Sequence, residues 1–159
     1  MIGKKFTKNN YDEIDYADTA IWCNENGAMI EDKGDYYEVV AIPEPTLDEV
    51  KAEKITSLKA DRDRLEVEDI EVDGHLYDYD EKARERINNA IIALQASGTS
   101  ILWTLANNDS VLVTAQDLVA VVSAVAVRSN TLHIAYRDAK AKVNAAMTAE
   151  EVNAVELEV

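Results

Sequence analysis

The spacing of hydrophobic residues changes from helical to strand-like within residues 1–45. Between Tyr16 and Asn26, Ala17, Ala20, Ile21 and Cys23 recur at helical spacing, and Asn26-Gly27 is a favourable helix stop. Two β-prone runs follow, Ala28–Asp32 and Tyr36–Ile42, and Lys33-Gly34-Asp35 separates them as a turn. Pro43 and Pro45 then end the second run, because proline cannot donate to a strand ladder. The pattern predicts a small N-terminal α+β unit over residues 1–45.

A helix is expected next, over residues 46–66. Thr46 and Glu49 have the spacing of a capping box, in which both side chains bond to free N–H groups at a helix start. The apolar positions form a thin stripe on a highly charged helix: Leu47, Val50, Ile55, Leu58 and Leu65. Such a stripe indicates a connecting helix packed on one side, or part of a coiled contact.

Residues 67–159 alternate between hairpin and helix patterns, which predicts a C-terminal α+β domain. Asp73-Gly74 supplies the positive φ values of a type I′ turn between two short strands. Asp80 and Gly98 bound a helix over 81–97, and its buried face is predicted to contain Ile87, Ala90, Ile91 and Leu94. A second hairpin is expected around the turn at residues 106–110. The fold class is therefore α+β, with short β-hairpins and a long C-terminal helix or helical hairpin.

The last helical pattern is unusually long. After a cap at Thr114 it continues from Ala115 to Met147, about 50 Å at ~1.5 Å per residue, against a radius of gyration of about 15 Å for a chain of this size. The helix is thus expected to bend, to split near Ser129-Asn130, or to project. Apolar positions alternate spacings of four and three, which is typical of a coiled-coil seam. Seven of them are candidate interface residues: Leu118, Val122, Val125, Leu132, Tyr136, Ala139 and Val143. Self-association along this seam and an ordinary core helix pair within one chain both fit the pattern.

The charge distribution adds a second reason to expect a protein partner. The net charge is -15, yet between Arg86 and Arg128 the charged residues are Asp109 and Asp117 alone. An apolar stretch with so few charges in an acidic chain indicates a core, a subunit contact, or both. The acidity disfavours nucleic acid and anionic membranes as partners. No run is expected to reach the length of a membrane span, because the longest apolar stretch, 118–127, is too short and Ser123 interrupts it.

The residue types that carry chemistry do not form a recognisable site. His75 and His133 lack the spacing of a zinc site, and Cys23 lies on an apolar helix face, where a buried thiol is the default. The spacing around Asp73, Asp78 and Asp80 does not fit a calcium loop. We therefore expect no catalytic, cofactor or metal residues and no enzyme activity. Two tryptophans and three aliphatic residues are expected as core anchors: Trp22, Trp103, Ile87, Ile91 and Leu94.

Several sequence blocks from residue 72 onward resemble a known family. The blocks are Asp73-Gly74-His75, Tyr77-Asp78-Tyr79-Asp80, Trp103-Thr104-Leu105-Ala106-Asn107-Asn108, Thr114-Ala115-Gln116-Asp117-Leu118, Leu132-His133 and Ala139-Lys140-Ala141. Together they resemble an uncharacterised domain family that is common in bacteriophages and prophages, over about residues 52–155. The run Trp22-Cys23-Asn24-Glu25-Asn26-Gly27 is similar to the leaders of such phage proteins.

The resemblance, and not the charge or periodicity, implies a function. Members of this family are small proteins associated with tail-fibre genes and are often grouped with tail-fibre assembly proteins. It implies a non-enzymatic tail-fibre accessory protein, an assembly chaperone that binds the fibre tip; the alternative is a structural component of the fibre or baseplate in the virion. The expected partner is a tail-fibre or tail-tip protein, or a second copy of the chain. No signal peptide is visible, so the expected location is the host cytoplasm during assembly, or the virion tail.

Overall fold

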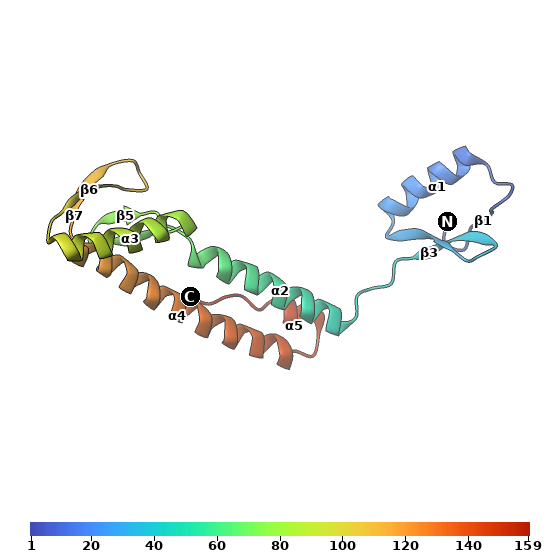
Figure 1. The fold of residues 1–159 in the computed structure, drawn as a ribbon. Coiled ribbons are helices and arrows are strands. Elements are labelled where there is room, and N and C mark those ends of the chain that lie inside the picture. Colours follow the sequence, from blue (N-terminus) through green and yellow to red (C-terminus); the bar gives the residue numbers. More distant parts are fainter. The chain divides into compact units, whose positions relative to one another are not determined.

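The computed structural model describes residues 1–159, which form two compact units, Met1–Pro45 and Thr46–Val159. Figure 1 shows the elements of each unit in the colours of the sequence. The class is α+β, as predicted, with small sheets and a long C-terminal helix. The first unit contains β1 (Lys5–Thr7), α1 (Glu13–Glu25), β2 (Ala28–Asp32) and β3 (Tyr36–Ala41). The second contains α2 (Leu47–Glu66), β4 (Ile70–Val72), β5 (His75–Tyr77), α3 (Glu81–Ser97), β6 (Ile101–Thr104), β7 (Ser110–Val113), α4 (Ala115–Ala145) and α5 (Ala149–Asn153).

The first unit is one helix packed on a three-stranded antiparallel sheet of order β1-β3-β2. Its buried apolar residues are Phe6, Cys23, Ala28 and Val39, and Trp22 packs partly buried against them. Trp22 is thus a partial core anchor and not a fully buried one. The strand β1 was not predicted, because three residues are too short for an alternating pattern to be visible.

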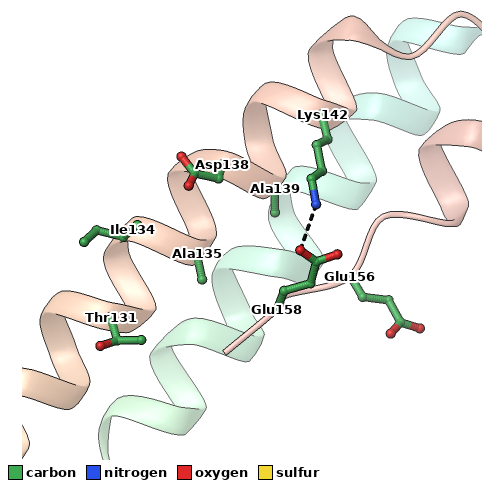
Figure 2. Close-up of a pocket in the computed structure, with 8 residues that line it drawn as sticks. All are labelled: Thr131, Ile134, Ala135, Asp138, Ala139, Lys142, Glu156 and Glu158. Carbon is green, nitrogen blue, oxygen red and sulfur yellow. Dashed lines mark hydrogen bonds and ion pairs between the residues drawn. The ribbon is translucent and has the colours of Figure 1, made fainter.

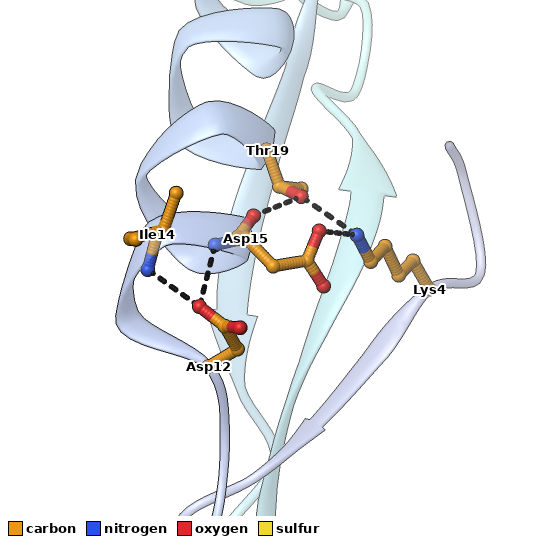
Figure 3. A network of polar contacts seen from close by, with 5 residues as sticks. All are labelled: Lys4, Asp12, Ile14, Asp15 and Thr19. Carbon is orange, nitrogen blue, oxygen red and sulfur yellow. Dashed lines mark hydrogen bonds and ion pairs between the residues drawn. The ribbon is translucent and has the colours of Figure 1, made fainter.

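Polar contacts at the start of α1 explain why this helix begins earlier than the apolar spacing suggested. The Asp12 carboxylate accepts from the backbone N–H of Ile14 (2.9 Å) and Asp15 (3.2 Å), so the helix starts at Glu13. Figure 3 shows these contacts together with Lys4, whose ammonium group pairs with the Asp15 carboxylate and donates to the Thr19 hydroxyl at 3.1 Å. Thr19 is fully buried. The network attaches the segment before β1 to the side of α1.

The second unit confirms most of the predicted boundaries. Thr46 and Glu49 form the predicted capping box, and Thr114 forms another with Asp117. The turn between β4 and β5 has positive φ at Asp73 (51°) and Gly74 (77°), as a type I′ turn requires. The Asp80 carboxylate caps α3. Gly98 ends this helix in the left-handed conformation at φ 66°.

The helix α2 is part of the second unit rather than a separate connector. It runs beside α4, as Figure 1 shows, and the apolar sides of the two helices form one core with α5. Leu58, Ala139 and Val143 lie in this core, and Val155 and Leu157 from the chain after α5 pack against it. A second core lies under α3, the β6–β7 hairpin and the first half of α4, around Ile87, Leu94 and Trp103, which confirms these three anchors; Ile91 is only partly buried.

The predicted interface seam on α4 is filled from within the chain. Five of its seven residues are buried in the two cores, namely Leu118, Val125, Leu132, Ala139 and Val143, and Val122 and Tyr136 are partly buried. The five buried positions are therefore covered within one chain, as in the alternative of a core helix pair, and they are not free to form an intermolecular contact. Both readings require the same spacing, so the sequence could not separate them. The helix is also a single element of 31 residues, without a break at Ser129-Asn130.

Candidate interaction surface

The uncharged stretch between Arg86 and Arg128 folds into one half of the second unit. It supplies most of α3, the β6–β7 hairpin and the first part of α4, which enclose the core around Ile87 and Trp103. The same stretch leaves several large apolar side chains exposed to solvent: Ile92, Ile101, Leu102, Leu112, Val119 and Val127. The stretch is therefore both a core and an exposed surface.

The β6–β7 hairpin carries two leucines on its solvent side. The register pairs Leu102 with Leu112 and Trp103 with Val111. Because successive side chains alternate between the two faces of a strand, Trp103 and Val111 face the core, whereas Leu102 and Leu112 lie opposite each other on the outer side. The two leucines are 69% and 66% exposed. We call this pair the hairpin face.

The outward side of α4 is a second apolar face. Val127 is 69% exposed, and Val119 and Ile134 are also exposed on this helix. An 18-residue window of α4 has a mean hydropathy of 1.5, with 22% of it buried, so by length and composition alone the helix could cross a membrane. This corrects the expectation that no run is long enough. The side of α4 that faces α2 and α3 nevertheless belongs to the protein core.

A cleft beside the C-terminal half of α4 has walls of both charged and apolar residues. Figure 2 shows the chain end running beside α4, where Lys142 of the helix pairs with Glu158 at 2.9 Å. The cleft has a volume of about 200 Å³ and also contains Asp138 and Glu156. Its single hydroxyl, on Thr131, donates to the backbone carbonyl of Val127 at 3.0 Å. The ion pair holds the chain end against the helix, which is a structural role.

The two histidines lie on different elements and in different surroundings. His133 is on α4, with Nε2 2.9 Å from the Glu66 carboxylate at the end of α2. His75 lines a polar cavity of about 550 Å³ between the two hairpins, together with Asn107 and Asp109. No group of three or more His, Cys, Asp or Glu side chains gathers to hold a metal ion.

The perturbed acids of this unit belong to helix caps. Backbone and side-chain hydrogen bonds from Thr114 hold the pKa of Asp117 below its usual value. The same contacts from Thr46 lower the pKa of Glu49. Burial raises the pKa of Tyr77 in the core under the hairpins. Each shift is explained by local structure, so none indicates a reactive group.

Sequence reasoning selected the buried side of α4 and missed Leu102 and Leu112. The signal was present: Ile101-Leu102-Trp103 is apolar at every position, and a two-stranded hairpin has one face to bury. One of the two sets of side chains therefore had to remain exposed. The sequence alone did not say that this hairpin has no further neighbour.

Comparison with known proteins gives one match. No curated protein and no solved structure matches the chain. Residues 49–156 match the model of a family described as "Domain of unknown function (DUF4376)". The match covers nearly all of the second unit and none of the first. The chain therefore belongs to this domain family.

Proposed function

We propose that this protein is a non-enzymatic accessory protein of a phage tail fibre, and that it acts as an assembly chaperone at the fibre tip. Tail-fibre association follows from the sequence resemblance described above. The observation that supports a binding role is the hairpin face, with Leu102 and Leu112 exposed and directly opposite each other. Fully burying one leucine is worth about 1.5–3 kcal/mol, so a partner that covers both gains a substantial part of a specific affinity.

The charge pattern suits such a role. The chain as a whole is strongly acidic, which keeps the free protein soluble. The two leucines of the hairpin face are uncharged and lie in the stretch without lysine or arginine, so the face itself brings no ion that a partner would have to desolvate. Before a partner of this kind assembles, the apolar surface that its own subunit contacts will later bury is exposed. A neutral apolar face on an acidic carrier can cover that surface until assembly is complete.

The test is co-expression with a tail-fibre protein encoded in the same genome. We expect the fibre to become soluble and to co-elute with this protein in size-exclusion chromatography with light scattering. The doubly substituted Leu102→Lys, Leu112→Glu variant should lose at least tenfold in affinity. This pair keeps the net charge and places opposite charges across the strands, so the hairpin is retained.

The matched control changes two exposed apolar residues of the same unit that lie outside the uncharged stretch. Val67→Lys with Met147→Glu also leaves the net charge unchanged. If the control impairs binding as strongly as the hairpin pair, the hairpin face is not the site. If fibre solubility does not depend on this protein, the chaperone proposal fails. Recovery of the protein in purified virions would instead favour a structural component of the tail.

A further inference from the structure

The first unit offers one unprotected sheet edge. Hydrogen bonds from Ile42 to Gly27 and from Lys33 to Tyr36, both 2.9 Å, fix which residues of β2 bond to β3. With the observed register, Met29 and Glu31 bond inward as well. Ala28, Ile30 and Asp32 therefore direct their N–H and C=O groups away from the sheet, and β2 has no other neighbouring strand.

The two edges of this sheet differ in how they are protected. The β1 edge is three residues long, contains Lys5 and is flanked by Lys4 and Lys8, whereas the lysine next to β2, Lys33, is paired with Glu31. Short length and lysines are the usual ways of blocking a strand edge. The β2 edge is five residues long and has no lysine in the strand. Met29 is 43% exposed on it. An added strand would thus meet fewer obstacles at β2 than at β1.

A shallow apolar groove runs along the β2 edge beside α1. Its walls are formed by Tyr16, Ala20 and Cys23 from the helix and by Ala28 and Ile30 from the strand, and its volume is about 270 Å³. From Tyr16 to Asn24 the helix wall is about 12 Å long, which matches an extended segment of about four residues. The groove can receive alternate side chains of a strand whose backbone pairs with β2.

The charge of the first unit indicates which residues a bound strand would have at its solvent-facing positions. The first unit has ten acidic residues and four lysines. All four lysines are already paired: Lys4 with Asp15, Lys5 with Glu38, Lys8 with Asp32 and Lys33 with Glu31. The unpaired charge that remains is negative, and it favours lysine or arginine at the positions of a bound strand that face solvent.

We propose that the first unit binds an extended segment of another protein, with alternating aliphatic and basic residues, as an additional strand on β2. Main-chain hydrogen bonds to Ile30 and Asp32 supply the pairing, because Ala28 is buried and the open part of the edge lies toward the turn. The aliphatic side chains lie in the groove between α1 and β2. This site is on the unit outside the family match, so the inference does not depend on the proposed function.

The probe is the synthetic peptide acetyl-Lys-Val-Lys-Val-Lys-Val-Lys-amide, titrated into the full-length protein. We expect slowed hydrogen exchange at the Ile30 and Asp32 amides, measured by NMR. N-methylation of the two central peptide amides should weaken binding at least tenfold, because one of them faces β2 in either strand direction. Replacing the lysines of the peptide by glutamate should also weaken binding at least tenfold.

Two matched variants of α1 locate the site. Ala20→Gln places a long uncharged side chain in the groove and should reduce affinity at least tenfold, whereas Ala17→Gln, on an exposed position of the same helix, should leave it unchanged. Glutamine is a good helix former, so both variants should fold. Equal binding by the N-methylated peptide would overturn the proposal, as would peptide-induced shifts confined to the second unit. The proposal would also be overturned if the protein forms a dimer that excludes the peptide and that Ala20→Gln dissociates. In that case a second copy of the chain occupies the β2 edge.

Discussion

The two units are stabilised in different ways. The first surrounds Phe6 with a cluster of tyrosines, with ring centroids 6.1 Å from Tyr11 and 5.2 Å from Tyr16, and fastens its surface with lysine–carboxylate pairs. The second has two aliphatic cores along α4 and a capping box at the start of each of its two longest helices. The stability of the small first unit thus depends on few buried side chains, whereas in the second unit many side chains along α4 share the burial.

That difference should appear most strongly as unequal tolerance to core truncation. Stability of roughly 0.05–0.15 kcal/mol per residue gives about 2–7 kcal/mol for 45 residues and about 6–17 kcal/mol for 114. Phe6→Ala removes about 3–5 kcal/mol and should unfold the first unit, while Leu118→Ala removes about 2–5 kcal/mol and should leave the second folded. Hydrogen exchange by mass spectrometry, read separately on peptides of each unit, measures both effects. Joint unfolding of the two units in either variant would contradict the comparison.

Among the tertiary polar contacts of the second unit, the loss of those made by Arg128 should have the next largest effect. The Arg128 guanidinium on α4 donates to the backbone carbonyls of Glu66 (2.9 Å) and Asp69 (3.2 Å), at the end of α2. Arg128→Leu leaves these carbonyls without that donor, and we expect a loss of about 1.5–3 kcal/mol, measured by urea unfolding. Arg137→Leu, which removes an exposed arginine paired with its neighbour Asp138, is the control and should change stability by less than about 0.5 kcal/mol.

The features that the sequence predicted are those that depend on neighbouring residues. The helix caps at Thr46, Asp80 and Thr114 and the turn at Asp73-Gly74 were predicted because each depends on residues within a few positions. The strand β1 and the filling of the α4 seam depend on partners in other elements, and the exposure of Leu102 depends on the lack of one. A periodic pattern gives the face of a helix that is covered. It does not give the chain that covers it.

A smaller, local loss is expected at the cap of α4. Thr114→Ala removes the hydroxyl that bonds to Asp117 and should destabilise the second unit by about 1 kcal/mol. Because hydrogen bonds lower the pKa of Asp117 below 3.8 in the folded protein, its contribution is present above that pH and is lost as the pH falls through the folded value. The variant should move this pKa up toward 3.8 and weaken the dependence of stability on pH below 4. A carboxyl NMR titration together with acid unfolding measures both changes, and an unshifted Asp117 would count against the capping box.

The smallest expected effect tests whether each surface ion pair of the first unit acts independently on the pKa of its own carboxylate. The Lys8 ammonium group donates to the Asp32 carboxylate at 2.7 Å and, together with the backbone N–H of Gly34, lowers the pKa of Asp32. Lys8→Met should raise this pKa toward 3.8, and Lys33→Met, which breaks the neighbouring pair with Glu31, should leave it in place. The stabilisation from ionised Asp32 is present at neutral pH and is lost only as the pH falls through its lowered pKa. At pH 7 each variant should therefore lose only the small contribution of its own exposed ion pair. An NMR titration measures the pKa of Asp32 in both variants. If both raise it equally, the lysines act through the net charge of the first unit and not through individual contacts.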